Sequence, residues 1–428
     1  MSQHDPYAAL RHPGYRCLLG GGVIASLGLE IQAVAVAWEL YDRTDSAWYL
    51  ALAGLAQFLP VLLFALPAGQ IADHLSRKRL FQLAQLGSAF ISLTLAWLSW
   101  SQGPVHVILL CLFLSGTTRA FSAPARTALL PQVVPGEALT NAVTWNSTGW
   151  QVANISGPAL GGFLLAAAPP WLAYLVTASC SLVCVLLLTP IVPLIEQRVN
   201  TTRSLAALLA GVRFVLNNPL LLGAISLDLF AVLLGGATAL LPIYARDILQ
   251  VGPTGLGWLR AAPALGAVIM ALTMAHRPPL QRPGLAMLLA VAGFGLATVV
   301  FGLSTSFPLS LAMLGLLGAL DNISVVVRGT LMQVLTPDEM RGRVAAVNTV
   351  FISSSNELGQ FESGVTAAWW GPVTAVVVGG VGTMVVVGVV LTACPRLLKL
   401  SPLHLLRRTE VADEIPPGTT SKNPAQVV

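Results

Sequence analysis

The chain has 428 residues, of which 55% are hydrophobic and only 10% are charged, and its mean hydropathy is +0.76. Soluble globular domains carry about 25% charged residues, so this composition excludes a water-soluble protein and places the chain in lipid. We attribute the net charge of +5 to membrane topology and to contact with anionic lipids of the bilayer, and therefore expect no nucleic-acid partner.

Twelve segments of the chain are long and apolar enough to be membrane-spanning helices. A helix needs about 20 mostly apolar residues to cross roughly 30 Å of hydrocarbon. The first segment carries Glu30 and is too long for a cleavable signal peptide. The pattern predicts an all-α membrane protein with twelve transmembrane helices, at 16–41, 48–72, 80–101, 104–124, 141–168, 171–193, 219–244, 255–275, 284–304, 308–332, 344–366 and 373–395.

The distribution of lysine and arginine predicts the orientation of these helices. With the N-terminus in the cytoplasm, eighteen of the twenty-three basic residues fall on the cytoplasmic side. Only Arg43 and Arg246 fall on the other side, and Arg119, Arg260 and Arg328 lie within helices. Because positively charged loops resist translocation, we expect both termini to be cytoplasmic, with residues 396–428 forming a disordered tail.

An internal repeat divides the chain into two halves. Residues 126–137 (RTALLPQVVPGE) align without a gap on residues 328–339 (RGTLMQVLTPDE), at an offset of 202. The repeat predicts two homologous six-helix bundles, at 1–193 and 219–395, joined by a cytoplasmic linker at 194–218 in which an amphipathic helix can form. Two such halves around a midplane site are typical of transporters that alternate access by rocking.

The loop after the second segment has a recognisable pattern. Its sequence GQIADHLSRKR, from Gly69 to Arg79, resembles the G-x-x-x-D-x-x-x-R-K loop of the major facilitator superfamily. Gly69 permits close helix approach, Asp73 can complement a helix N-terminus, and Arg77 and Lys78 are expected to pair with carboxylates across the interface between the halves. These contacts would hold one conformer. The alternative is that the basic residues only set the topology.

The fifth segment carries a second motif. Its sequence GPALGG is similar to the core of the antiporter motif of the same superfamily, although the upstream glycines of that motif are absent. The proline bends the helix, and the glycines permit tight packing that can seal a pathway, which favours export; a plain packing face is the alternative. The motif residues are Gly157, Pro158, Gly161 and Gly162.

Nearly the whole chain resembles the bacterial export branch that contains enterobactin-type siderophore exporters and macrolide efflux proteins. The resemblance is carried by WELYDRTDS at 38–46, FLP at 58–60, AFSAPAR at 120–126 and PDEMRGR at 337–343. It implies the major facilitator fold and a monomeric bacterial inner-membrane protein that moves a small molecule. It also implies that the protein is not an enzyme.

Ionisable side chains inside a bilayer cost about 2.5 to 3.5 kcal/mol each on insertion scales, so each one is a candidate functional residue. By the resemblance, helices 1, 4, 7 and 10 line the cavity, which directs Glu30, Arg119, Asp228 and Asp321 toward the pathway. Burial near mid-membrane favours a protonated carboxyl group, which makes Glu30 the first candidate for a proton carrier. Arg119 partly resembles the helix 4 arginine linked to proton coupling. The repeat also sets Arg119 opposite Asp321, so a purely structural pair is equally open.

Other polar residues have weaker assignments. Asn154 and Asn356 can contact a substrate or bridge helices, and Trp38 can line an aromatic cavity or simply pack. The cysteines and histidines lack the spacing of a metal site, and no nucleotide-binding motif occurs. A set of charged residues near the loops is expected to act as conformational gates: Arg126, Glu137, Arg328, Glu339, Arg341 and Arg343.

The sequence therefore predicts a secondary transporter that uses the proton gradient, without a cofactor, to export a small amphipathic solute such as a drug or a siderophore-like molecule. An importer or facilitator of a small nutrient on the same fold is the alternative. A receptor that binds its ligand without transporting it is a third possibility, which the loop motif and the intramembrane carboxylates disfavour.

Overall fold

The computed structural model describes residues 5–192, 205–278, 280–337, 340–398 and 400, and within these ranges its regular structure is helical, without strands. The prediction of an all-α membrane protein is confirmed. The long helices are α1 (Pro13–Thr44), α2 (Ala47–His74), α3 (Arg77–Trp100), α4 (Val105–Val133), α5 (Leu139–Ala167), α6 (Pro170–Leu188), α7 (Leu205–Asn217), α8 (Pro219–Leu234), α10 (Gly252–Ala275), α11 (Pro283–Leu303), α12 (Phe307–Leu335), α13 (Arg341–Trp370) and α14 (Pro372–Ala393).

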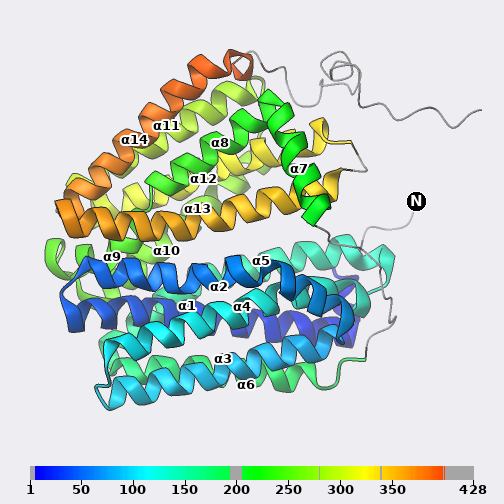
Figure 1. The fold of residues 1–428 in the computed structure, drawn as a ribbon, viewed down its shortest axis with the longest axis vertical. Coiled ribbons are helices and arrows are strands. Elements are labelled where there is room, and N and C mark those ends of the chain that lie inside the picture. Colours follow the sequence, from blue (N-terminus) through cyan, green and yellow to red (C-terminus); the bar gives the residue numbers. More distant parts are fainter. Residues whose placement is uncertain (1–4, 193–204, 279, 338–339, 399, 401–428) are drawn as a thin grey trace, which may run out of the picture.

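The helices form two bundles that lie one above the other in Figure 1, with α1–α6 in one and α8–α14 in the other. The offset of 202 recurs in the helix boundaries: α4 and α12 begin at 105 and 307, α5 and α13 at 139 and 341, and α6 and α14 at 170 and 372. Helix α7, in the linker, crosses one end of the second bundle and packs on α13, where Gly211 meets the backbone of Arg343.

The seventh span departs from the single helix expected at 219–244. Helix α8 ends at Leu234, and the chain continues through short turns, η3 (Ala237–Leu240), α9 (Leu241–Ile243) and the π-helical η4 (Tyr244–Ile248). The break falls at Gly235 and Gly236. A Cβ at Gly236 would lie 2.5 Å from the carbonyl oxygen of Gly359, so the missing side chain permits α13 to approach at the break.

Ten spans in the described residues are long and apolar enough to cross a membrane, and they leave out α5 and α13. Both of these helices are long enough, with 29 and 30 residues, but they are too polar. They lie at the boundary between the bundles, where α5 packs on α10 and α13 packs on α2. Their polar residues therefore face a boundary within the protein instead of lipid alone, and the helix count agrees with the twelve predicted.

The two bundles are closed against each other at one end. Gly162 of α5 meets Gly257 of α10, and Gly364 of α13 meets Ala51 of α2. A polar cluster joins the same end, where Arg246 of η4 donates to Asp45 after α1, at 2.8 Å. In Figure 1 this closed end is on the left, beside α9, and α1 begins at the opposite end.

Candidate functional site

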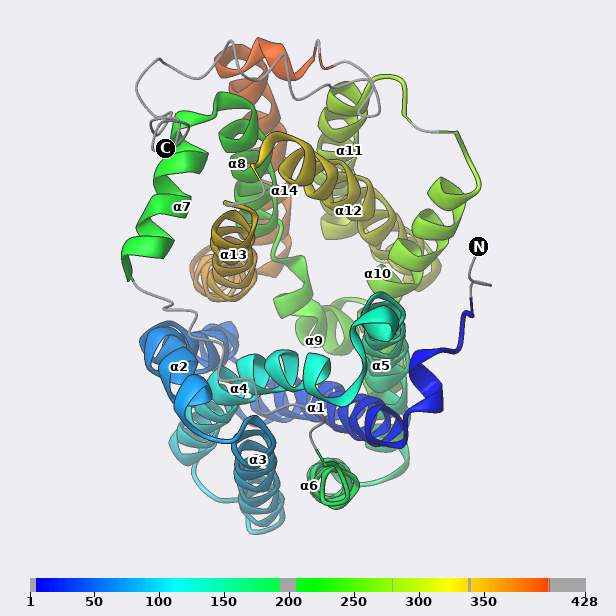
Figure 2. The same ribbon diagram turned by 90° about the vertical axis from the view of Figure 1, so that its right-hand side faces the viewer.

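A cavity of about 550 Å³ lies between the two bundles. Its walls come from α1, α2, α3, α4 and α5 of the first bundle and from η3, α10 and α13 of the second. Figure 2 views the molecule from the end opposite the closed end, and α1, α4, α9 and α13 lie around the centre of the molecule in this view. The volume is in the range of about 300 to 1,000 Å³ that is usual for small-molecule sites.

Five ionisable residues line this cavity within the described part of the chain, three arginines and two glutamates. Four of them form one network. Glu30 lies in the field of Arg260 and Arg119, and Arg260 also lies in the field of Glu357. These two cations and two anions balance. Arg126 is the fifth residue and stands apart from the network.

An ion pair in this network crosses between the bundles. Arg119 of α4 donates from Nη2 to Glu357 Oε1 of α13. A second cross-bundle contact lies close by, where Arg260 of α10 donates to the carbonyl oxygen of Ala33 in α1 at 3.0 Å. The pairing of Arg119 with Asp321 suggested by the repeat is wrong. The repeat relates α4 to its equivalent helix α12, whereas Arg119 of α4 pairs with Glu357 of α13, which is not the equivalent helix.

Glu30 lines the cavity at the point where α1 packs on α5. A Cβ added to Gly157, the first glycine of the helix 5 motif, would overlap Glu30 Cβ. Gly161 packs on Ile31 in the same way, with its added Cβ 3.2 Å from Ile31 Cα. Gly157 and Gly161 therefore permit α5 to pack closely on the turn of α1 that carries Glu30, and Gly162 permits the close contact with α10. Pro158 lies inside α5 beside them.

Arg126 lies two turns inside α4 and lines the cavity. It donates to Asn146 Oδ1 at 2.8 Å and to Ser26 Oγ at 3.4 Å, and its buried Nε has no partner. Gly22 makes room for the guanidinium, since a Cβ there would be 2.7 Å from Nη2. The expected place at a helix end beside a loop is wrong, because α4 extends beyond the predicted end at 124.

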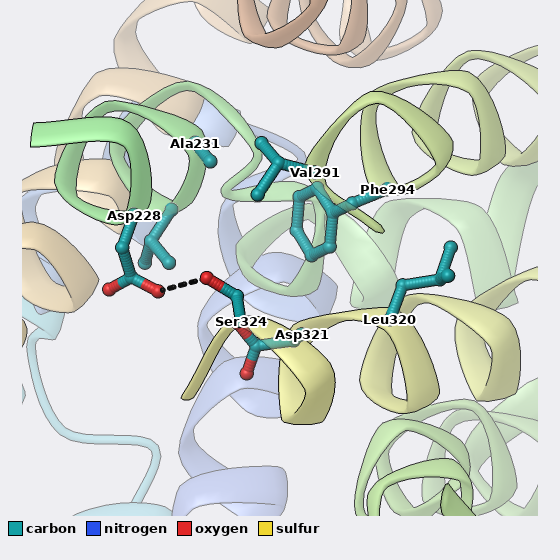
Figure 3. A pocket seen from close by; sticks show the side chains of 8 residues that line it. Asp228, Ala231, Val291, Phe294, Leu320, Asp321 and Ser324 are labelled. Atoms are coloured by element: carbon teal, nitrogen blue, oxygen red, sulfur yellow. Dashed lines mark hydrogen bonds between the residues drawn. The ribbon is translucent and has the colours of Figure 1, made fainter. Parts of the chain in front are cut away.

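The second bundle holds a separate polar cluster. Arg328 of α12 forms a buried ion pair with Asp228 of α8, and Ser324 donates to Asp228 at 3.4 Å. Asp228 and Asp321 line a small cavity of about 10 Å³, which Figure 3 shows beside Phe294. Asp228 and Asp321 thus lie apart from Glu30 instead of sharing one pathway with it. Arg328 lies inside α12, as its position in the predicted segment 308–332 implies, and not at a helix end by a loop, as was expected of the gate residues.

Three predicted substrate residues are absent from the lining of the large cavity. Asn154 is half-buried on α5, the exposed Asn356 donates to the carbonyl oxygen of Ile352 in its own helix, and Trp38 packs against the core. The cavity instead has polar and aromatic residues that the sequence analysis did not select. These are Ser26, Gln32, Gln57, Phe81, Gln85, Ser115, Ser122, Trp150, Thr238 and Gln360.

The basic residues of the loop motif bind helix ends in their own bundle. Arg77 donates to the carbonyl oxygen of Ala128 in α4 at 3.1 Å, and Lys78 donates to that of Thr189, after α6, at 2.6 Å. The expected pairing with carboxylates across the interface is therefore wrong. Carbonyls near a helix C-terminus attract cations through the helix dipole. Gly69 and Asp73 are in α2, and the side chain of Asp73 lies outside the described residues.

Glu137, Arg341 and Arg343, which were also expected to be gates, do not line the cavity. Glu137 is exposed in the turn η2 (Gly136–Ala138) before α5. Arg341 and Arg343 are exposed at the start of α13, where Arg341 donates to the carbonyl oxygen of Gln333 at 3.4 Å. Glu339 lies outside the described residues.

At the closed end, Arg246 organises a group of acidic residues. It contacts Asp45, Asp42 and Asp247, and its guanidinium lies over the ring of Tyr41, 5.4 Å from the ring centroid. Tyr41 also donates its hydroxyl to Asp247. Since Tyr41, Asp42 and Asp45 belong to the first bundle and Arg246 and Asp247 to the second, this cluster is a polar latch between the bundles.

Comparisons with solved structures agree with this architecture. A bacterial homologue of the human lysosomal transporter Spinster, in an inward-facing and occupied conformation, is similar with a TM-score of 0.72 and 14% identity, over 92% of this chain and 98% of that one. A bacterial homologue of the iron transporter ferroportin, in an inward-facing state, gives a TM-score of 0.68 with 16% identity, over 90% and 98% of the two chains. At these identities the likeness shows the fold alone.

Sequence comparisons identify closer relatives. The chain is 30% identical over 418 residues to the enterobactin exporter EntS of Shigella boydii serotype 18, covering 96% of both chains, and it matches the exporter of Escherichia coli O1:K1 equally well. The family model described as transmembrane secretion effector matches residues 4–411. This chain is therefore a membrane transporter and not an enzyme, and it belongs to the transmembrane secretion effector family of the major facilitator superfamily.

Proposed function

We propose that this transporter exports a small amphipathic solute, a drug or a siderophore-like molecule, by proton-coupled alternating access in a bacterial inner membrane. The observation that carries the proposal is the charged cavity between two bundles that touch at one end. Relatives named as exporters support the outward direction. An importer or facilitator on the same fold is the alternative, and the proposal takes the protein as a monomer.

The orientation proposed for the chain determines the side of the membrane toward which the cavity lies. The contacts between the bundles gather at the end formed by the α1–α2 turn and η4. The cavity extends toward the other end, where Gly22 and Arg126 line it and where α1 begins. With cytoplasmic termini, this conformation receives its solute from the cytoplasm, and an exporter must then break the contacts at the closed end to release it.

The charge network offers a physical basis for coupling. Rocking of the bundles moves Glu357 and Arg260 relative to Arg119 and Glu30, so the attraction between these groups opposes the movement. Protonation of Glu30 removes one negative charge and weakens that attraction. A proton that enters from one side and leaves to the other can thus favour one conformer and then the other.

The direction of transport is tested first. A growth screen that compares a deletion strain with its complemented parent identifies a transported compound, and flux of that compound is then measured in everted vesicles. Accumulation inside everted vesicles under an imposed proton gradient is expected for an exporter. Movement only in the opposite direction would establish the importer, and saturable binding without any flux would establish a receptor.

Proton coupling is tested in proteoliposomes with the same compound. Glu30→Gln keeps the side-chain volume and removes the titrating group, so it should abolish accumulation driven by a pH gradient while keeping downhill exchange. Asp228→Asn is the comparison, because Asp228 lies in the separate cluster of the second bundle. If only Asp228→Asn fails to accumulate the compound, and the reconstituted variant is folded and still exchanges it downhill, coupling moves to that cluster. If both variants accumulate it like the parent, neither carboxylate carries the proton.

A further inference from the structure

Arg126 is a charged side chain in the cavity wall whose hydrogen-bond partners are neutral. Asn146 and Ser26 accept from its two terminal nitrogens, and the buried Nε has no partner. The titratable groups that act on it electrostatically are Cys184 and Tyr15, and neither is a carboxylate. Among the described residues, no acidic side chain forms an ion pair with Arg126.

The equivalent arginine of the second bundle has the partner that Arg126 lacks. At the offset of 202, Arg126 corresponds to Arg328, and Ser26 corresponds to Asp228. Arg126 contacts Ser26 and Arg328 contacts Asp228, so the same pair of positions meets in both bundles. The arrangement is shared, but the acid of the second bundle is replaced by a serine on the wall of the large cavity.

The other charges of the cavity do not supply the missing anion. Glu357 is engaged by Arg119, and Glu30 lies in the field of Arg260 and Arg119. Removing an arginine from water without a counter-ion is expensive, since each buried ion pays a desolvation cost of several kcal/mol. Water can solvate Arg126 while the cavity is open, but a cavity closed around a solute needs an anion there.

We infer that Arg126, together with Ser26 and Asn146, binds an anionic group of the transported solute, such as a carboxylate, a sulfonate or an acidic phenol. The guanidinium offers a planar fork of N–H donors that suits such groups. Trp150 and Phe81 line the same cavity and offer apolar surface to the rest of the molecule. This inference rests on the proposed function and narrows its substrate class to amphipathic anions.

The test uses two probes of the same shape, 2-naphthoate and the neutral 2-naphthamide. Calorimetric titrations of the purified full-length chain in nanodiscs, without any gradient, should show the anion binding at least tenfold more tightly than the amide. Inorganic phosphate is titrated separately. Equal affinity for the anion and the amide would overturn the inference, and so would phosphate binding as tightly as naphthoate, because the site would then recognise a free inorganic ion.

Two variants test whether naphthoate binds at Arg126. Arg126→Gln removes the charge, and Ser26→Asp supplies an internal counter-ion that copies the pair of Asp228 and Arg328. Both should weaken naphthoate binding at least tenfold and change naphthamide binding less than threefold. Arg213→Gln removes an exposed positive charge from α7 and is the matched control, expected to leave both affinities unchanged.

Failure of folding is separated from loss of the site by Ser26→Asp, which adds a partner for a buried charge and should not lower the thermal midpoint. Full naphthoate affinity in a folded Ser26→Asp variant would refute the assignment. Failure of the site and failure of the proposed function give different results. Anion binding without proton-driven flux would refute coupling and keep the site, and flux of neutral solutes alone would refute the site and keep transport.

Discussion

Gly162→Ala is a direct test of whether the closed end holds this conformer. The Cβ of the alanine would lie 2.6 Å from the carbonyl oxygen of Pro253 and 2.7 Å from Gly257 Cα. Both are backbone atoms of α10, so no side chain can turn away to relieve the overlap. Reaching ordinary contact at 3.4 Å requires the helices to separate locally by up to about 0.8 Å, which is the difference between 3.4 and 2.6 Å.

Such overpacking costs about 1 to 3 kcal/mol. Because the overlap is between the bundles, this cost destabilises the observed conformer and leaves the fold of each bundle intact. The balance between this conformer and one open at that end should therefore shift by roughly 5- to 150-fold.

The shift is measured by electron–electron resonance between spin labels on Ser101 and Gln250, both exposed at the closed end. The five native cysteines are first replaced. A longer distance should gain population in Gly162→Ala. Gly388→Ala, which meets nothing within 4 Å, is the matched control and should leave the distribution unchanged. An unchanged distribution in Gly162→Ala, or an equal shift in the control, would show that this contact does not set the conformer.

Three further predictions concern the second bundle, the loop motif and the topology. Asp228→Asn leaves Arg328 buried without its counter-ion and should cost about 3 to 5 kcal/mol. This appears as a lower thermal midpoint that Arg328→Gln partly restores, and equal midpoints of single and double variants would contradict the pairing. Asp73→Asn should slow transport more than it lowers expression, and normal transport at a normal protein level would leave the loop as a topology signal only. Reporter fusions should place residue 428 in the cytoplasm, and a reporter active outside would overturn the orientation.

The sequence was sufficient to locate the membrane spans, because each crossing of the hydrocarbon needs about 20 apolar residues, and such a run is visible without any periodic pattern. It also located Glu30 and Arg119 in the cavity wall, since an ionisable residue in an apolar span has few other tolerable places. The interruption of α8 was missed, although Gly235 and Gly236 stand together there, because an apolar segment stays apolar through a broken helix.

The partners of the charged residues could not be read from the sequence. Arg119 binds Glu357, 238 positions away, and this choice depends on how the two bundles dock. The repeat offset relates equivalent positions of the two bundles, so the contact between Arg126 and Ser26 in the first bundle corresponds to the contact between Arg328 and Asp228 in the second. It contains no information on contacts between bundles. Asn154 and Asn356 illustrate the same limit, because their shared position in the repeat is a position outside the cavity wall in both bundles.

The two bundles share one helix arrangement but carry their charged residues at different positions, and this difference decides which charged residues form contacts between the bundles. The second bundle keeps Asp228 and Arg328 as an internal pair, whereas the first bundle turns Arg126 toward the cavity. In the described residues, the ionisable groups that the second bundle contributes to the cavity are Arg260 and Glu357, and both reach the first bundle. The rocking movement that we propose would change both contacts at once. A solute anion at Arg126 and a proton on Glu30 would therefore act in the same cavity with opposite signs of charge, which provides a route for the exchange of an anion against protons.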